Sequence, residues 1–376
     1  MDFDLAPELA LLQETARAFA QDRLRPHERE HERARRPGDA VLRLHRETGL
    51  AGLELPESLG GAGLGALARV LVNEELAAAD PGAAVALDPL GPAVAALRAI
   101  GGEEALRGFA LPLLARPEAR AAVLVDTRPR LRVAEGRARG RWPWAPADRV
   151  DLLVVLERER VYVLRDGVTA TPLRGAGLRA AGASELSVDG AIAAEIVSTP
   201  RARRALAHAR LWAASLLVGT ARAAAERSRA YALERVAFGR PIAHHQALAF
   251  LIADMASAVE AARLATWDAA LRLDAAPDDD GLGAQRADEM AACAFLEAAE
   301  AAAFVTPNGV QILGGHGFMQ DHPLEKWMRE AKALSLLFGG VDLAREDAGR
   351  ALAAADEPLA LVAPAPGPAG AGEAPR

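Results

Sequence analysis

Residues 310–332 read VQILGGHGFMQDHPLEKWMREAK, and this stretch decides how the rest of the chain is interpreted. Glycines at 314, 315 and 317 allow backbone amides to approach a ligand closely, because glycine tolerates the unusual φ angles that such a turn needs. A phosphate is one ligand that such a turn can hold. Farther along the stretch, Glu325 and Arg329 are expected to form a structural ion pair.

Helical patterns surround this stretch. After Pro200 the apolar residues recur on one helical stripe, formed by Leu248, Ile252, Met255, Val259 and Ala262. Alanine-rich helices are predicted to end before Pro307 and near Phe338. We therefore expect a helical bundle over 201–355. The tail 356–376 is rich in Pro, Ala and Gly and is expected to be disordered, because it cannot bury enough apolar surface.

Short β-branched runs occupy the middle of the chain. They read AAVLVD (121–126), VDLLVVLE (150–157) and VYVLRDGVTATPL (161–173). The dipeptide Asp166-Gly167 inside the third run is typical of a hairpin turn. These runs predict a small β domain over 119–200.

The N-terminal part is predicted to be helical. One apolar helical face is formed by Leu5, Leu9, Leu12, Ala16 and Phe19. Pro26 is expected to end that helix, and further helix is expected to about Leu114, giving a helical domain over 1–118. Helices followed by strands and again by helices favour an α+β fold with segregated layers over a doubly wound sheet.

One motif suggests a nucleotide-binding loop at first sight. GAGLGA at 61–66 fits the pattern G-x-G-x-x-A, but Pro56 and Glu57 stand where the buried strand that precedes such a loop should be. We therefore interpret it as an ordinary loop before a helix. Walker, nucleophile-elbow and zinc-protease motifs are absent from the sequence.

Composition excludes several classes of protein. The chain has 44 basic and 51 acidic residues, a net charge of −7, and the Arg201, Arg203 and Arg204 run lacks interleaved aromatics, so nucleic-acid binding is not expected. A single cysteine, Cys293, excludes a disulfide framework and a multi-cysteine metal site. No membrane span and no secretion signal are expected, which makes the cytoplasm the expected location.

Three segments together resemble the acyl-CoA dehydrogenases, flavoproteins that oxidise the Cα–Cβ bond of acyl-CoA thioesters. They are GLAGLELPESLGGAGLG (49–65) followed by EELAAAD, then YALERVAFGRPIAHHQ (231–246), and the stretch 310–332 itself. The resemblance implies an N-terminal helical domain, a small, trimmed β-barrel and a C-terminal four-helix bundle. It also implies an acyl-CoA substrate and a dimer or tetramer.

The resemblance assigns a set of residues to FAD, some of them contributed across a subunit interface. These are Arg235, Phe238, Gln246, Gln311, Gly314, Gly315 and Trp142. Arg235 offers a fork of donors suited to a pyrophosphate. Two structural alternatives stay open: Arg235 pairs with a helix carboxylate while the glycines cap helices, and Phe238 packs in the core. His244, His245 and His316 are expected to be surface or structural residues.

The family's catalytic glutamate has no counterpart at either expected position. The family usually places this base in an aromatic-Glu-Gly-Thr segment, and Gly339 replaces the glutamate there. Members that keep the base on an earlier helix, next to a substrate-binding arginine, align it with Ala209 and the arginine with Arg210. Asp342 or Glu346 could substitute only if the backbone were rearranged.

The middle domain departs from the family as well. It lacks the T-E-P-x-A-G-S-D loop that wraps flavin and substrate, and reads LVDTRPRLRVAEGRARGRW instead. Trp142 matches the family's tryptophan against the flavin. Pro143 follows it, however, and the threonine that donates to flavin N5 is missing. FAD is thus the expected cofactor, although the missing threonine argues against its binding.

Three functions follow from these residues. The first is a base-lacking subunit that pairs with a base-bearing homologue and completes the partner's FAD site. The second is a self-sufficient acyl-CoA dehydrogenase with a non-standard base. The third is a flavin-free scaffold or acyl-CoA-binding module. A flavin monooxygenase on the same fold needs no such glutamate, but no residue points to oxygen chemistry.

Overall fold

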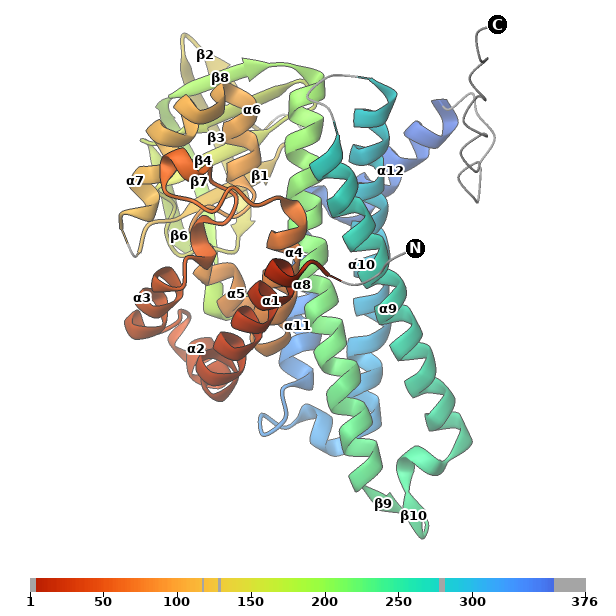
Figure 1. Cartoon of the computed structure of the whole chain (residues 1–376). Helices are drawn as coiled ribbons and strands as arrows, with labels where there is room; N and C mark the ends of the chain where they lie inside the picture. Colours follow the sequence, from red (N-terminus) through yellow and green to blue (C-terminus); the bar gives the residue numbers. More distant parts are fainter. Residues whose placement is uncertain (1–4, 117, 128–129, 277–280, 355–376) are drawn as a thin grey trace, which may run out of the picture.

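Helices build the N-terminal part of the chain, in the computed structural model shown in Figure 1, which describes residues 5–116, 118–127, 130–276 and 281–354. The helices are α1 (Pro7–Phe19), α2 (Glu28–Ala34), α3 (Asp39–Glu47), α4 (Ala66–Ala79), α5 (Pro81–Leu87), α6 (Ala93–Ala105) and α7 (Leu111–Leu114). Almost every residue of α4 is buried, because α4 lies between α1 and the long helix α8 (Thr199–Glu234). The tail 356–376, predicted to be disordered, lies outside the described residues.

The first helix does not end at Pro26. A π-turn over Ala20–Leu24 and a 3₁₀ turn over Arg25–His27 follow α1 and lead directly into α2. Proline is accepted in the first turn of a helical segment, because the N–H that it lacks would have no intrahelical partner there. At the predicted break, the chain therefore changes from α-helix to a π-turn and then to a 3₁₀ turn before α2 begins.

Two four-stranded sheets form the middle domain. The strands are β1 (Ala121–Val125), β2 (Arg132–Ala134), β3 (Arg137–Ala145), β4 (Leu152–Leu156), β5 (Arg160–Leu164), β6 (Val168–Pro172), β7 (Ser184–Ala191) and β8 (Ala194–Val197). One sheet has the order β1-β4-β5-β8 and the other β2-β3-β7-β6. Inward side chains from both, such as Leu153 and Leu186, share one core. The described strands close no barrel; they form two packed sheets.

The dipeptide Asp166-Gly167 does not make the predicted hairpin. β5 pairs with β4 and β8, whereas β6 pairs with β7, so the dipeptide carries the chain from one sheet to the other. Gly167 has a φ of +71°, and a Cβ there would lie 2.2 Å from the carbonyl oxygen of Asp189. Turn chemistry was predicted correctly from the sequence, but strand pairing is a long-range property that a dipeptide does not encode.

Long helices form the C-terminal bundle. They are α8, α9 (Gln246–Ala275), α10 (Leu282–Leu313), α11 (Leu324–Leu334) and α12 (Gly340–Ala354), with the two-residue strands β9 (Val236–Ala237) and β10 (Arg240–Pro241) between α8 and α9. α10 lies against α8, α9, α11 and α12. Alanine has the highest helix propensity and lets helix axes approach closely, which suits this packing.

The helix predicted to end before Pro307 continues to Leu313. Proline removes one backbone hydrogen bond from a helix interior. Side chains bond two carbonyls beside that gap: Thr306 Oγ1 donates to Ala302 at 2.8 Å, and Asn308 Nδ2 donates to Phe304 at 2.7 Å. The packed neighbours of α10 hold the helix together through this defect.

The segment Leu282–Phe318 is long and apolar enough to cross a membrane, with a mean hydropathy of 1.3 in its most apolar window. Of that window, 56% is buried inside the protein. The apolar residues face α8, α9, α11 and α12. We therefore interpret α10 as the central helix of the bundle.

A buried charge cluster joins the N-terminal domain to the bundle. Lys326 Nζ lies 2.7 Å from Asp80 Oδ1 and 2.8 Å from Glu330 Oε2, and all three side chains are fully buried. His31 Nδ1 lies 3.0 Å from the other oxygen of Asp80. Burial raises the pKa of Glu330 to about 7, whereas Lys326 and His31 hold the pKa of Asp80 below its ordinary value despite its burial.

The predicted ion pair between Glu325 and Arg329 is confirmed. Arg329 Nη2 lies 2.7 Å from Glu325 Oε2 and 2.7 Å from Glu32 Oε1. The charged half of the stretch 310–332 therefore serves the domain interface.

Candidate active site

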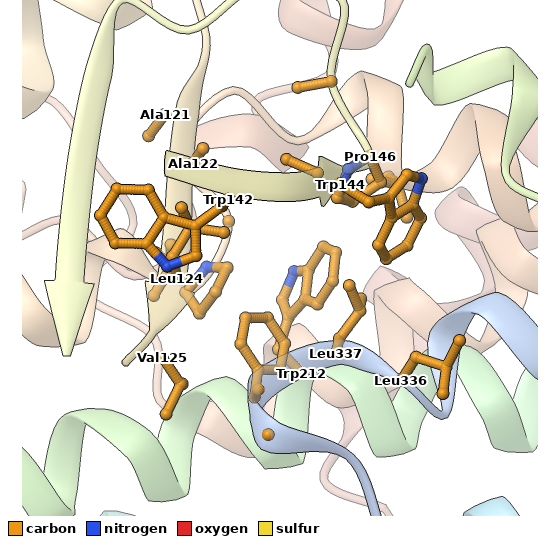
Figure 2. A pocket seen from close by; sticks show the side chains of 18 of the residues that line it. Ala121, Ala122, Leu124, Val125, Trp142, Trp144, Pro146, Trp212, Leu336 and Leu337 are labelled. Carbon is orange, nitrogen blue, oxygen red and sulfur yellow. The ribbon is translucent and has the colours of Figure 1, made fainter. Parts of the chain in front are cut away.

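A cavity of about 330 Å³ opens between the middle domain and the bundle. Strands β1 and β3, the loop between α5 and α6, helix α8, and a 3₁₀ turn η9 (Leu337–Gly339) surround it. Four aromatic residues contribute to its walls, and Figure 2 shows the indoles of Trp142, Trp144 and Trp212 around one space. We call it the aromatic cavity; its lining includes Asp88, Gly91, Pro92, Asp126, Trp142, Trp144, Trp212, Phe338 and Gly339.

Trp142 reaches the cavity because β3 alternates buried and exposed positions. The indole is 4% exposed, and its Nε1 has no hydrogen-bond partner among the described residues. The pairing of β3 with β7 becomes irregular between Trp142 and Ala145, the segment that contains Pro143. Trp144 lies two residues after Trp142, on the same face of the strand, and lines the cavity as well. Trp142 thus lines a cavity, and its predicted contact with a flavin stays a prediction.

Gly339, at the expected position of the catalytic base, lines the aromatic cavity. Its φ is +90°, and a Cβ built on it would lie 2.3 Å from Leu343 Cδ2 and 2.9 Å from Leu343 Cβ. Phe338 before it also has a positive φ, +52°. The backbone of this turn therefore accepts glycine and opposes a glutamate at 339, because left-handed φ angles and the contact with Leu343 both disfavour a side chain.

Ala209 and Arg210 take different directions from α8. Ala209 is fully buried in the main core. Arg210 lines a separate cavity between α8 and α12, where its Nη2 lies 2.6 Å from Asp347 Oδ2. Burial lowers the pKa of the Arg210 guanidinium, and Asp347 opposes that shift. The structure thus places the predicted substrate arginine outside the lining of the aromatic cavity.

Two carboxylates line the aromatic cavity, and sequence reasoning had identified neither. Asp88 accepts from the backbone N–H of Gly91 at 2.8 Å and from Trp212 Nε1 at 2.9 Å. Asp126 uses one oxygen to accept from the backbone N–H groups of Arg130 and Leu131, and its other oxygen has no partner among the residues described. Only proximity in the fold reveals them, since no motif surrounds either residue.

The two acids considered as substitutes for the base lie elsewhere. Asp342 is exposed in the first turn of α12, and Glu346 is exposed and ion-paired with Arg350. Neither lines the aromatic cavity. The rearrangement that they would need is therefore large.

A second group of predicted residues gathers at the opposite end of α8. Arg235, Gly314 and Gly315 line an open cavity of about 400 Å³ at the start of the 3₁₀ turn η8 (Gly314–Phe318). Gly314 has a φ of +59°, which glycine tolerates. Gln246 is exposed at the start of α9, and Gln311 is exposed near the end of α10. We call the set Arg235, Phe238, Gln246, Gln311, Gly314 and Gly315 the far-end site.

Both structural alternatives for the far-end site can now be examined. Arg235 forms no ion pair with any described residue, whereas Gly314 does cap a helix, because it is the C-cap of α10. Phe238 is 95% exposed, so the core-packing alternative is wrong. Its φ is +52°, and its ring packs edge-on against His245, at 6.0 Å between centroids. An exposed arginine and an exposed phenylalanine at one end of a bundle are typical of a surface that binds another molecule.

Histidines beside the far-end site are more ordered than the sequence suggested. The ring of His316 stacks on His322 at 5.6 Å, and Tyr231 Oη lies 2.9 Å from His316 Nδ1. Arg227 Nη2 lies 3.2 Å from His322 Nδ1. Residue chemistry alone did not predict this cluster, because α8 and the loop after η8 meet only in the fold.

The aromatic cavity and the far-end site are separated along α8. Trp212 and Arg235 are 23 residues apart, which corresponds to about 35 Å at the rise of an α-helix. Figure 1 shows the β9–β10 end of the bundle far from the two sheets.

The motif GAGLGA is not a nucleotide loop. It ends at the N-terminus of α4, and there Asp274 of α9 accepts from the backbone N–H of Ala66 at 2.6 Å and of Leu67 at 3.1 Å. A Cβ on Gly65 would lie 2.4 Å from that carboxylate. A protein carboxylate therefore fills the anion-binding end of this helix, as the sequence context led us to expect.

The residues present fit a flavin with one departure. The aromatic cavity offers flat walls from three indoles, and Trp142 Nε1 is a buried donor with no described partner. The far-end site offers an unpaired guanidinium and an open glycine turn, the chemistry that a pyrophosphate needs. The departure is Pro143, which has no N–H and contributes no donor to the cavity.

Family comparisons cover most of the chain. The model of the acyl-CoA dehydrogenase N-terminal domain matches residues 6–118, and that of the C-terminal domain matches residues 199–353. "Probable acyl-CoA dehydrogenase FadE25" of Mycobacterium tuberculosis is 30% identical over 93% of this chain and 96% of its own length. "Cyclohex-1-ene-1-carbonyl-CoA dehydrogenase" of Syntrophus aciditrophicus is 40% identical over 39% of this chain and 34% of its own length.

Solved structures share the fold. Butyryl-CoA dehydrogenase from Megasphaera elsdenii superposes with a TM-score of 0.81, at 23% identity over 94% of this chain and all of that one. Glutaryl-CoA dehydrogenase from Mycobacterium smegmatis superposes with a TM-score of 0.76, at 24% identity over 93% of this chain and 95% of that one. Both therefore support the three-part architecture.

Proposed function

The chain belongs to the acyl-CoA dehydrogenase family, and from that premise we propose that it acts in the α,β-dehydrogenation of acyl-CoA thioesters as a base-lacking subunit of a hetero-oligomer. In this arrangement a base-bearing homologue performs the proton abstraction. This chain contributes its far-end site to the partner's FAD.

The observation that carries this proposal is the backbone at Gly339. Proton abstraction needs a carboxylate within hydrogen-bond reach of the α-carbon. Gly339, which aligns with the family's base, lines the aromatic cavity with a φ of +90°, and a Cβ built on it would lie 2.3 Å from Leu343 Cδ2. The backbone of this turn favours glycine at 339. The local conformation as well as the sequence therefore argues against a glutamate there.

FAD is the cofactor that the family uses, and two groups of residues would hold it. The aromatic cavity would hold a ring system against Trp142 and Trp144. The far-end site would bind a pyrophosphate through Arg235 and the amides of Gly314 and Gly315. When bound, the flavin supplies the acceptor for the hydride that leaves the β-carbon of the thioester.

A two-chain site explains the exposure of the far-end residues. The guanidinium of Arg235 and the ring of Phe238 are exposed, and about 35 Å of helix separates them from the aromatic cavity of the same chain. A second molecule docked at this end would cover both. In that position they would reach a cofactor whose ring lies in the second molecule.

A self-sufficient enzyme is the second candidate, and one observation favours it. Asp126 lines the aromatic cavity with an oxygen that is buried and has no partner among the described residues. A carboxylate oxygen in that state can accept a proton if the substrate α-carbon comes within reach. Asp126 would then be the non-standard base.

The experiment compares this chain alone with this chain co-purified with a base-bearing homologue from the same genome. We expect the co-purified sample to absorb at 450 nm and to dehydrogenate acyl-CoA, and this chain alone to show no dehydrogenation. Arg235→Ala in this chain should lower the flavin content of the pair. Equal activity of the lone chain would exclude the proposal and support the self-sufficient enzyme.

A variant of Asp126 separates the two candidates further. If the lone chain is active, Asp126→Asn should abolish its activity without removing the flavin absorption. A lone chain and a pair that are both colourless would instead support the flavin-free scaffold or acyl-CoA-binding module.

A further inference from the structure

Trp212 stands between two cavities. Its indole, Gly91 and Pro92 line both the aromatic cavity and a smaller cavity of about 20 Å³ on the other side. We infer that the indole of Trp212 is the end wall of the acyl-binding space, so that this chain takes thioesters of short acyl groups and rejects long ones. The inference rests on the proposed function only in taking the ligand to be an acyl-CoA thioester.

The indole is held in place on several sides. Its Nε1 donates to Asp88 Oδ2 at 2.9 Å, and the other oxygen of Asp88 accepts from the backbone N–H of Gly91 at 2.8 Å. Phe338 packs edge-on against the indole at 6.2 Å between ring centroids, with an interplanar angle of 77°. An indole that is 7% exposed and anchored in this way cannot swing aside without breaking a buried hydrogen bond to a carboxylate.

The space behind the wall does not suit a hydrocarbon chain. It is lined by Glu54 and Arg69, whose charged groups lie 3.1 Å apart, and by His208. Arg69 Nη1 also lies 3.9 Å from Asp88 Oδ2. Methylene groups pushed past Trp212 would enter a space of only about 20 Å³ beside this buried ion pair, which leaves little room for an alkyl chain although Val70 and Leu211 also line it.

Selection of the acyl-chain length follows from the anchored indole of Trp212 and from the small space behind it. Each methylene buried against apolar walls improves affinity about four-fold, the equivalent of about 0.8 kcal/mol. In this chain that gain should stop where the acyl group meets the indole. A butyryl group stays on the cavity side of the wall, whereas octanoyl and palmitoyl groups have to displace it.

The test measures binding of acetyl-, butyryl-, octanoyl- and palmitoyl-CoA to the purified protein by isothermal titration calorimetry. Wild type should bind butyryl-CoA tightest. Trp212→Ala should bind octanoyl-CoA tighter than butyryl-CoA, with about a four-fold gain for each methylene that enters the vacated space. The matched control is Trp267→Ala, because Trp267 Nε1 is likewise anchored on a carboxylate, 2.8 Å from Glu74, but lines neither cavity.

Trp212→Phe serves if Trp212→Ala does not fold. Phenylalanine keeps part of the wall and loses the hydrogen bond to Asp88, so its length preference should fall between wild type and Trp212→Ala. Circular dichroism reports the fold of each variant. If the folded variants keep the wild-type ratio of affinities for octanoyl-CoA and butyryl-CoA, Trp212 does not limit the acyl length. The same conclusion would follow if wild type bound palmitoyl-CoA tightest.

Failure of the wall and failure of the proposed function give different results. The binding ratio reports on Trp212 whether or not the chain performs chemistry. Dehydrogenation by the lone chain would contradict the proposal of a base-lacking subunit. It would leave the ratio of affinities for octanoyl-CoA and butyryl-CoA unchanged. If neither wild type nor Trp212→Ala binds any of the four thioesters, the acyl-length inference is wrong, whereas the role of Arg235 in a partner's flavin site can still be tested by flavin content.

Discussion

Gly339 shows at the scale of one residue how a backbone conformation opposes a side chain. A glutamate there would have to adopt a φ of +90° and displace Leu343. Left-handed backbone costs an ordinary residue about 1–2 kcal/mol before any steric contact is counted. Restoring the family's carboxylate therefore needs a different turn, and a single substitution does not supply one.

We expect Gly339→Ala to lower the free energy of unfolding by more than about 1 kcal/mol, and Gly339→Glu to remain inactive in acyl-CoA dehydrogenation. Urea unfolding and an electron-acceptor assay measure the two effects. Gly349 is the matched control: it lies inside α12 with nothing within 4 Å of a built Cβ, so Gly349→Ala should be neutral or stabilising. An active Gly339→Glu variant would contradict the rigid-turn argument.

His45 links one residue to the pH dependence of the whole chain. The ring is 1% exposed, packs edge-on against Phe19 at 5.5 Å, and has no hydrogen-bond partner among the described residues. Burial lowers its pKa to about 4, from an ordinary value near 6.5. In the unfolded chain the ring takes up a proton below pH 6.5, and in the folded chain it does so only near pH 4.

The contribution of His45 to stability should therefore be present above pH 6.5 and lost as the pH falls toward 4, by on the order of 3 kcal/mol in total. His45→Leu should lose less stability than wild type between pH 7 and pH 4.5. Chemical unfolding at several pH values measures the difference. His244→Leu, at an exposed position, should keep the slope of wild type; equal slopes for all three proteins would refute the assignment.

At the scale of elements, α11 is fixed by charge as much as by apolar packing. Lys326 and Glu330 lie one turn apart on α11 and pair with each other, and Lys326 also pairs with Asp80 at the junction of α4 and α5. Removing one member of a buried ion cluster leaves an uncompensated charge, which usually costs about 3–5 kcal/mol. This cluster explains why a charged helix sits at the centre of the domain interface.

The chain contains only two lysines, and they form a natural pair of variants. Lys326→Met should lower the free energy of unfolding by about 3–5 kcal/mol, because Asp80 and Glu330 would lose their cation. Lys332→Met changes an exposed residue of the same helix and should stay within about 0.5 kcal/mol of wild type. Equal unfolding midpoints for the two variants would show that the cluster carries no stability.

At the scale of the whole molecule, the exposed residues at the far-end site favour association with a second chain. Phe238 is 95% exposed between β9 and β10, and Phe318 is 73% exposed at the end of η8. Exposed aromatic side chains next to an unpaired arginine favour association with another subunit. In the proposed hetero-oligomer the partner subunit would bury Phe238 and Phe318.

Phe238→Ser should weaken subunit association at least ten-fold and leave the circular dichroism of the chain unchanged, because the ring contributes nothing to the core of its own chain. Sedimentation velocity of the pair measures the association. Leu282, 69% exposed at the start of α10, provides the control variant Leu282→Ser, which should associate like wild type. Unchanged association of Phe238→Ser would remove this surface from the interface.

What the sequence determined by itself is local. Helical periods after Pro200, the β-branched runs between 119 and 200, and the glycines of 310–332 predict elements and turns correctly, because period and backbone freedom act within a few residues. The resemblance in that last stretch then supplied the architecture and the missing base at 339. The hairpin at Asp166-Gly167 and the helix end at Pro307 were wrong, because distant neighbours overrode a local preference.

Tertiary structure alone decided which residues meet. Asp88 and Trp212 are 124 positions apart and share a hydrogen bond, and Asp274 caps a helix that begins 208 residues earlier. The same packing turned Arg210 toward Asp347 and away from the aromatic cavity. Such contacts depend on how packed elements are placed in space, and no spacing along the chain records that placement.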